Sequence, residues 1–338
     1  MKRLFGVIFV LAMTCTAAFG LNPEPAAVFV RVIDVGAGLC CVVKMPGDHY
    51  MVYDAGDYPE QGKVAFDGIA QLVPQGQPIE LLVLSRSDSD HHGAVKRIFD
   101  HYTVKKVIRS GLERETQTWQ RSNAAIKAAR QAKKTRDINL KYYEFPPGAT
   151  YRFGDVFVTF VCGFYAPPSD WNINPQTHMS EFRNAGSIAI RLQYKGKSIL
   201  FTGDAVGRHI GDPDNALMAT EKFMIANSAV IPIDSDVLIA PHHGADNGVS
   251  AAFIAAVSPQ YVIFSAGHKY EHPRAAAANR YLVRGLSTDY MFRTDLGDDE
   301  GQDEWAFGRI QGHTDKAGDQ DIDILIRPDG NVVVAYRE

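Results

Sequence analysis

The feature that most constrains the fold of this chain is a series of short apolar runs that each end in aspartate or histidine. Four such ends occur, and in chain order they carry Asp88, Asp90 and His91, then Asp204, then His242 and His243, then His268 and His272. Short apolar runs are typical of buried strands, and strand ends that share one edge of a sheet can direct polar side chains toward one cation. Four unrelated polar loops are the less simple explanation. The sequence therefore predicts stacked sheets with a metal site at one edge.

Strand-like and helix-like segments alternate along the chain after residue 20. The expected strands are rich in Val, Ile, Leu and aromatic residues, and they cover residues 28–35, 41–45, 50–54, 81–84, 104–108, 156–162, 188–194, 198–201, 237–239, 261–264, 322–326 and 332–335. The expected helices cover residues 92–99, 116–134, 215–226, 250–257 and 273–283. A turn at Lys195 and Gly196 predicts a hairpin. Because no linker or low-complexity tract interrupts this alternation, we expect one α/β domain over residues 21–338, with two sheets covered by helices.

The first twenty residues have the layout of a secretory signal peptide. Lys2 and Arg3 precede an apolar run over residues 4–13, and small residues follow as far as Gly20. The apolar run is shorter than a membrane-spanning helix requires, which disfavours an uncleaved anchor. A lipoprotein cleavage site at Cys15 is a weaker alternative, because the residues before it fit poorly. We expect cleavage at the end of this segment, a secreted or periplasmic protein, and no integral membrane span in the mature chain.

Charge and loop composition restrict the possible partners only in part. The net charge of −4 provides no bulk attraction to nucleic acid, although a local basic groove is compatible with it. A basic stripe could follow a phosphodiester backbone, but a solvated helix face is the simpler interpretation. Several of its residues share one helix face, and it comprises Lys127, Arg130, Lys133, Lys134 and Arg136. The segment 167–184 is expected to be a long irregular loop, which would serve as a lid or binding wall or be a plain insertion.

Several cysteines and histidines are expected to have no chemical role. Cys40, Cys41 and Cys162 remain after signal removal, and an odd number leaves at least one thiol unpaired. We interpret them as buried strand residues rather than as a disulfide or a metal ligand. The histidines outside the four strand ends are expected at the surface, namely His49, His101, His178, His209 and His313.

The loop that follows residues 81–84 has the densest concentration of potential ligands. Asp88, Asp90 and His91 place two carboxylates and an imidazole within four residues, between a strand and a helix. This mixture favours Zn, Mn or Fe over a calcium site made only of oxygen atoms. Acidic residues at the positive end of a helix dipole are the alternative interpretation. Asp204 and the pair His242–His243, which also follow strands, favour the metal site.

These strings resemble the metallo-β-lactamase superfamily, and within it the soluble metallohydrolase domain of the competence protein ComEC and its secreted relatives. The resemblance extends from about Val28 to Ala335. Besides the loop with Asp90 and His91, it rests on Ile33-Asp34-Val35-Gly36-Ala37-Gly38, Val52-Tyr53-Asp54-Ala55-Gly56, Asn184, Ser187, Thr202-Gly203-Asp204, Pro241-His242-His243-Gly244, Tyr270, His272-Pro273 and Arg293-Thr294-Asp295. Each string is short, but their order and spacing together are specific.

The resemblance implies a four-layer αβ/βα sandwich with one or two metal ions at its edge. The first ion would use residues 86 and 88 of the loop together with a bridging Asp204. The second ion would use Asp90, His91, Asp204 and one histidine of the pair His242–His243. The usual first histidine of the loop is Arg86 here, and a guanidinium carries no lone pair for a metal. We therefore expect one firmly bound Zn²⁺ or Mn²⁺, and occupancy of the first position stays open.

The same resemblance implies a secreted metal-dependent hydrolase of the phosphodiesterase or nuclease type. Its substrate would be a phosphodiester or another anionic small molecule or polymer, DNA among them, while lactone or β-lactam cleavage is less supported. Asp90 would orient a metal-activated water, Arg86 would hold an anion, and His272 would donate a proton or bind a phosphate oxygen. Asp34 and Asp54 would support the ligands from outside. The alternative is a catalytically degenerate binding protein in which Arg86 has replaced a metal ligand.

Overall fold

The structure is a computed structural model that describes residues 21–56, 62–267, 269–295, 304–305 and 320–337. The expected signal peptide, residues 1–20, and His268 and His313 lie outside these described residues. Within the described part, no helix is both long and apolar enough to cross a membrane.

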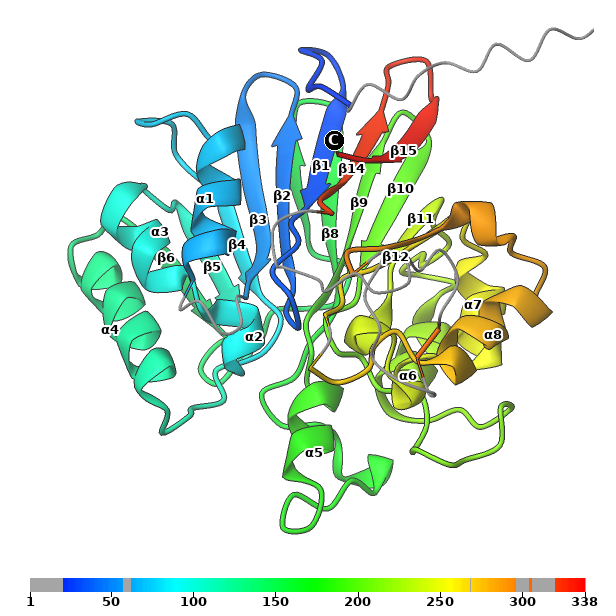
Figure 1. Ribbon diagram of the computed structural model, residues 1–338. Coiled ribbons are helices and arrows are strands. Elements are labelled where there is room, and N and C mark those ends of the chain that lie inside the picture. The colour runs from blue at the N-terminus through cyan, green and yellow to red at the C-terminus, as the bar shows by residue number, and fades with distance from the viewer. Residues whose placement is uncertain (1–20, 57–61, 268, 296–303, 306–319, 338) are drawn as a thin grey trace, which may run out of the picture.

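Two sheets form the centre of the molecule (Figure 1). The first sheet has eight strands in the order β15-β14-β1-β2-β3-β4-β5-β6, and the second has seven in the order β13-β12-β11-β10-β9-β8-β7. The first sheet comprises β1 (Val28–Val32), β2 (Cys40–Met45), β3 (His49–Ala55), β4 (Leu81–Leu84), β5 (Lys106–Arg109), β6 (Arg136–Asn139), β14 (Ile322–Ile326) and β15 (Val332–Tyr336). The second comprises β7 (Thr150–Phe153), β8 (Val156–Cys162), β9 (Ala189–Tyr194), β10 (Lys197–Phe201), β11 (Val237–Ile239), β12 (Tyr261–Phe264) and β13 (Met291–Arg293).

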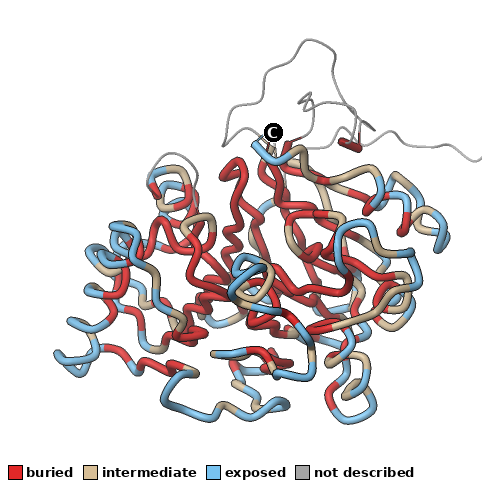
Figure 2. The backbone as a smooth tube through the Cα atoms, turned by 90° about the horizontal axis from the view of Figure 1, so that it is seen from below, coloured by how far each residue is buried: buried red, intermediate tan, exposed pale blue. Residues whose placement is uncertain are grey.

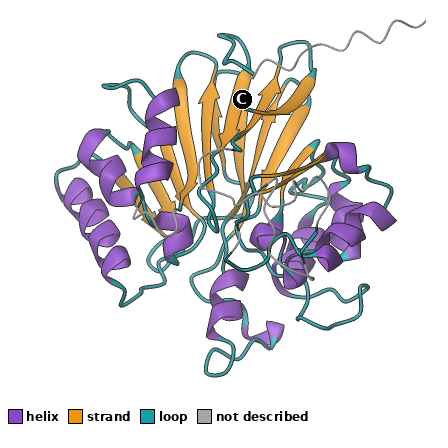
Figure 3. Ribbon diagram, in the orientation of Figure 1, coloured by secondary structure: helices purple, strands orange, loops and turns teal. Residues whose placement is uncertain are grey.

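Helices cover the outer face of each sheet (Figure 3). On the first sheet lie α1 (Lys63–Leu72), α2 (Ser89–His92), α3 (Val95–His101) and α4 (Gln117–Gln131). Beside the second lie α6 (Ala219–Asn227), α7 (Ala251–Val257) and α8 (Ala275–Val283), while α5 (Met179–Ala185) projects below the sheets in Figure 1. The expected four-layer αβ/βα sandwich is therefore confirmed.

Alternation along the strands separates the apolar core into layers. In β1, Val28, Val30 and Val32 pack between the two sheets, whereas Phe29 packs with the helices on the outer face. Successive side chains of a strand point to opposite faces, and both faces of β1 are buried, so this strand is apolar at nearly every position. A third core, which includes Phe253 of α7, fills the space between the second sheet and its helices. Figure 2 shows the buried backbone at the centre and the exposed segments around it.

Most expected elements are present, and the differences have physical reasons. Strand β6 was not expected, because its sequence is Arg-Asp-Ile-Asn; its Asp137 is buried through an ion pair of 2.8 Å with Arg109. Helix α1 was not expected either, since its Gly68 lowers helix propensity and lies directly against Ile33. The expected helix 92–99 is instead two helices, α2 and α3, separated by Gly93 and Ala94.

Other expectations differ in smaller ways. The short strands β7 and β13 were missed, and the segment 167–184 contains α5 where only an irregular loop was expected. The hairpin is confirmed, because β9 and β10 pair antiparallel around Lys195 and Gly196, which both have positive φ. Cys40, Cys41 and Cys162 are buried and free, as expected.

Candidate metal centre

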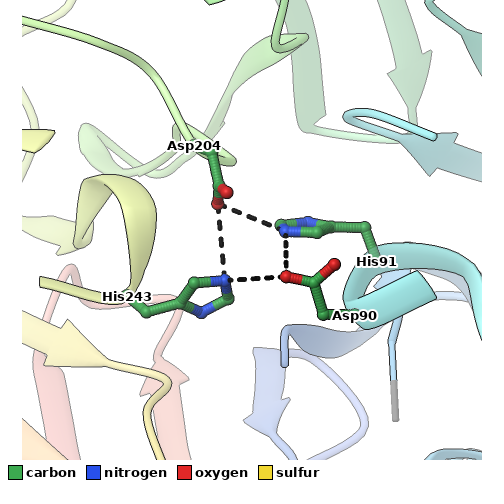
Figure 4. Close-up of side chains that lie close together, drawn as sticks. All are labelled: Asp90, His91, Asp204 and His243. Carbon is green, nitrogen blue, oxygen red and sulfur yellow. Dashed lines mark ion pairs between the residues drawn. The ribbon is translucent and has the colours of Figure 1, made fainter. Parts of the chain in front are cut away.

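Four side chains converge where the strands of both sheets end (Figure 4). Asp90 and His91 lie in α2, just after β4 of the first sheet, while Asp204 follows β10 and His243 follows β11 of the second sheet. Their candidate ligand atoms all lie within 4.8 Å of one another. Oδ1 of Asp204 is 3.2 Å from Nε2 of His91 and 3.4 Å from Nε2 of His243. Oδ2 of Asp90 lies 3.5 Å and 3.8 Å from the same two nitrogens.

The His91 ring is oriented from behind by Asp54. Nδ1 of His91 lies 2.8 Å from Oδ2 of Asp54, and both side chains are fully buried. The backbone N–H and the hydroxyl of Ser85 also donate to this carboxylate, at 2.7 and 2.6 Å. A proton held at Nδ1 leaves the lone pair of His91 on Nε2, directed at Asp204. Asp54 thus lies where a supporting carboxylate is expected.

His243 is oriented in the same way by the backbone. It lies in the turn Pro241–Gly244, where His242 and His243 both have positive φ. Nδ1 of His243 donates to the carbonyl oxygen of Ser265 over 2.7 Å, which again leaves Nε2 for the cluster. The sequence left the choice between His242 and His243 open, and the structure brings His243 into the ligand group.

The chemistry of this donor set fits a divalent cation. Nε2 of His91, Nε2 of His243 and Oδ1 of Asp204 are buried and have no hydrogen-bond partner among the described residues. Buried polar atoms without a partner are costly, so three of them at one point indicate a missing common partner. Two imidazoles and two carboxylates suit Zn²⁺ or Mn²⁺.

The charges around the cluster also favour a cation. Burial alone would raise the pKa of Asp204, but Arg86 and His91 lower it well below its usual value. The pKa of Asp90 is lowered too, since Arg86 and His91 outweigh burial. Burial would lower the pKa of His91, but Asp204, Asp90 and Asp54 raise it well above its usual value. Without an ion the ring therefore carries a second proton on Nε2, which a bound cation would displace. The carboxylates are therefore ionised and attract positive charge to the point where the ligand atoms meet.

Arg86 contacts the other carboxylate oxygen of Asp204, Oδ2. Its Nη1 donates to Oδ2 of Asp204 and to Oδ1 of Asn184, and its Nη2 lies 2.8 Å from Asp88 and 3.7 Å from Asp90. Burial would lower the pKa of Arg86, but the three carboxylates raise it, so the guanidinium stays charged. A fixed positive charge thus lies among the residues that the resemblance assigned to the first metal.

Asp88 and His242, expected as ligands, are placed differently. Both lie outside the ligand group, which holds Asp90, His91, Asp204 and His243. Asp88 pairs with arginines, and His242 is held by two amides: its Nδ1 lies 2.7 Å from Oδ1 of Asn247, and its Nε2 lies 3.2 Å from Nδ2 of Asn184. Nε2 of His242 also lies 3.6 Å from Oδ2 of Asp204. The assignment of Asp88 and His242 as metal ligands stays a prediction.

A cleft of about 650 Å³ opens beside the cluster. Its walls carry five Lys or Arg residues and three Asp or Glu residues, which are Arg86, Arg114, Arg183, Lys269, Arg274, Asp88, Asp90 and Glu271. His242, His243 and His272 also line the cleft. The His272 ring is stacked on His243 with 6.3 Å between centroids. Burial lowers the pKa of His272 well below its usual value, so this imidazole is neutral near pH 7.

Some residues were missed by the sequence interpretation, and others have no part in the site. Arg114 and Arg183 line the cleft, but no motif marks either of them. Asp34 is not a ligand, and its Oδ1 accepts from the backbone N–H of Gly36. The expected surface histidines include His101, His178 and His209, which are exposed, and His49, which is half-buried beside Glu80.

The two stacked sheets with outer helices and the cluster of Asp90, His91, Asp204 and His243 at the strand ends resemble the arrangement of the metallo-β-lactamase fold. The chain is similar to two proteins from bacterial competence systems. The chain is 27% identical over 290 residues to competence protein ComA of Neisseria gonorrhoeae, covering 81% of this chain and 32% of that protein. It is 24% identical over 217 residues to ComE operon protein 3 of Bacillus subtilis, covering 62% of this chain and 24% of that protein. The resemblance to competence proteins is thus confirmed, although the chain spans about a third or less of these relatives.

No family model matches the chain. Among solved structures, similar chains include CmlA, a diiron β-hydroxylase from Streptomyces venezuelae, with a TM-score of 0.44, 14% identity, and coverage of 80% of this chain and 53% of that one. Another is the metallo-β-lactamase fold protein YhfI from Bacillus subtilis, with a TM-score of 0.42, 13% identity, and coverage of 78% and 95%.

Proposed function

We propose that this protein is a secreted or periplasmic hydrolase that uses one firmly bound Zn²⁺ or Mn²⁺ to cleave a phosphodiester, DNA among the candidate substrates. The observation that carries the proposal is a set of three buried atoms that meet at one point without hydrogen-bond partners among the described residues, on His91, His243 and Asp204. They lie beside a cleft with an excess of basic residues. A divalent cation at such a point supplies Lewis acidity, which activates water near neutral pH. The basic walls favour an anionic substrate.

The side chains of the cleft divide the remaining work. Asp90 is ionised and lines the cleft, so it can accept a hydrogen bond from the attacking water and orient it. Arg86 stays charged and faces the same cleft, where it can stabilise negative charge that develops on the phosphoryl oxygens. Because His272 is neutral near pH 7, it acts as a hydrogen-bond donor to a phosphate or leaving-group oxygen rather than as an imidazolium acid.

A second function is favoured by one specific observation. The guanidinium of Arg86 is nearly buried and contacts both Asp204 and Asn184. If this contact fixes Asp204 so that no ion binds, the chain is a catalytically degenerate protein that binds an anion in the same cleft.

Metal content and turnover separate the two functions. We expect about one equivalent of zinc or manganese in protein purified without chelators, measured by inductively coupled plasma mass spectrometry. We expect hydrolysis of bis-p-nitrophenyl phosphate by the wild type and by the control His101→Ala, which changes an exposed histidine on α3. Asp204→Ala and His243→Ala should lose both metal and activity. Wild-type protein that holds no metal even after incubation with zinc would overturn the hydrolase and favour the binding protein.

A further inference from the structure

One carboxylate in the cleft is surrounded by three guanidinium groups. Asp88 lies 2.8 Å from Nη2 of Arg86, 2.9 Å from Nη1 of Arg114 and 3.1 Å from Nε of Arg183. The three arginines come from separate segments: the loop after β4, the loop after β5, and helix α5. Asp88 therefore holds together an arginine cluster, by which we mean Arg86, Arg114 and Arg183.

The arginine cluster has more positive charge than Asp88 can balance. Arg86 is also paired with Asp204 and lies 3.7 Å from Asp90, so these carboxylates balance its charge. Arg114 and Arg183 both pair with Asp88, and one carboxylate neutralises only one of two guanidinium groups. Each guanidinium has five N–H donors, yet the contacts of Arg114 and Arg183 among the described residues use one nitrogen each. Nε of Arg86 is buried and has no partner among the same residues. The cluster thus keeps donors and charge for a ligand.

The arginine cluster lies where its positive charge can contact a substrate. Arg86, Asp88, Arg114 and Arg183 line the same cleft as Asp90 and His243, so the cluster lies beside the candidate metal centre. The side-chain exposed fractions are 8% for Arg86, 16% for Arg183 and 27% for Arg114, so the guanidiniums are partly withdrawn from water. Charge-assisted hydrogen bonds are stronger in such surroundings. On the opposite wall Arg274 pairs with Glu271 at 2.7 Å.

We propose that the arginine cluster is an anion subsite that binds a phosphate group of the substrate, and that it takes the place of a first metal ion. This inference rests on the proposed function, and it adds Arg114 and Arg183 as residues that determine substrate specificity. Asp88 is a positioning residue, because it fixes the guanidiniums and does not touch the substrate. The planar fork of arginine matches two phosphate oxygens, so the subsite selects tetrahedral oxyanions over neutral esters.

Titration of zinc-loaded protein with inorganic phosphate, followed by calorimetry, tests the subsite without any turnover. We expect Arg114→Gln and Arg183→Gln each to weaken the phosphate Kd by about tenfold or more, because each loses a charge-assisted contact. Arg114→Lys should recover only part of the affinity, since lysine keeps the charge but loses the fork. The control Lys127→Gln removes an equal charge from the exposed face of α4 and should leave the Kd unchanged. A wild type that does not bind phosphate, or arginine variants that bind it as well as wild type does, would overturn the subsite.

Kinetics with bis-p-nitrophenyl phosphate distinguish a substrate subsite from a separate phosphate site. We expect both arginine variants to raise KM more than they lower kcat, and inorganic phosphate to compete with the diester. Inhibition that leaves KM unchanged would overturn the proposal, because phosphate would then occupy another place. Unchanged KM in both variants of an active enzyme would keep the hydrolase and reject the subsite. If the wild type is inactive but binds phosphate, and both arginine variants bind phosphate more weakly than the wild type does, the subsite is kept and the hydrolase is rejected.

Discussion

Nδ1 of His91 lies 2.8 Å from the carboxylate of Asp54, and this contact decides which nitrogen of His91 faces the metal centre. Asp54 has positive φ and is completely buried, while Ser85 donates two hydrogen bonds to it. The strand end therefore fixes Asp54, and Asp54 fixes the imidazole. A metal ligand in this fold is only as well oriented as the carboxylate behind it.

Asp54→Asn tests this relationship. Asparagine tolerates the left-handed conformation, so the substitution removes charge without straining the backbone. We expect zinc affinity to fall about ten- to a hundredfold, measured by competition with a fluorescent chelator. Asp48→Asn is a matched control, because Asp48 also has positive φ but is exposed and pairs with Lys44. Equal zinc affinity in both variants would contradict the role of Asp54.

Arg86→His should restore a ligand to the first position. The new imidazole would lie near Asp204 and Asp88, whose charges Arg86 now balances. We expect the metal content to rise from about one toward about two ions per chain, measured by mass spectrometry of the purified protein. Arg86→Gln removes the same charge without supplying an imidazole, and it should stay near one ion. A content of one ion in both variants would show that more than Arg86 blocks the first position.

Asp88→Asn separates a metal ligand from a residue that positions arginines. Because Asp88 contacts three guanidiniums and lies outside the ligand group, we expect an unchanged metal content and a KM for the diester that rises several-fold. Asp90→Asn changes a member of the ligand group and should instead lose metal. Loss of metal from Asp88→Asn would return Asp88 to the ligands that the sequence resemblance implied.

Glu221 of α6 gives the fold a pH dependence away from the metal centre. Its Oε2 accepts from the backbone N–H of Ser250, its Oε1 has no partner among the described residues, and burial raises its pKa to about 8. The unfolded pKa is about 4.3, so the folded state binds this proton more tightly, and stability falls as pH rises between these values. The loss is at most about 1.4 kcal/mol per pH unit.

Glu221→Gln mimics the protonated form and should remove this loss. Urea unfolding between about pH 5 and about pH 8 should show the variant gaining stability relative to wild type as the pH rises. Glu115→Gln, at an exposed glutamate, should follow the wild-type curve. If the Glu221→Gln and wild-type curves stay parallel, Glu221 is not protonated in the folded protein near neutral pH.

One sequence pattern predicted both the fold and three of the four residues in the candidate ligand group. Apolar runs that end in Asp or His identify both the buried strands and the polar groups at their ends, so the positions of Asp90, His91 and Asp204 could be predicted. Strand β6 could not, because Asp137 enters it as half of a buried ion pair with Arg109. A pattern based on apolar residues does not detect an element that is buried through paired charges.

The rest of the site depends on partners that are distant in sequence. His243 rather than His242 joins the ligands because the carbonyl of Ser265 orients its ring. Asp88 pairs with Arg114 and Arg183, which reach it from other segments. Neither the contact of His243 with Ser265 nor the contacts of Asp88 with the two arginines can be predicted from neighbouring residues in the sequence. These contacts form only when the chain is folded.

The division of the four ligands between two sheets has a consequence for how the protein matures. Asp90 and His91 are synthesised with the first sheet, whereas Asp204 and His243 follow far later in the chain. A ribosome-bound fragment that ends before β10 can offer an ion only two ligands. Strands β14 and β15 of the first sheet follow the second sheet in the sequence, so the first sheet is complete only after the second has been synthesised. We therefore expect an ion to bind only after both sheets have formed and packed together.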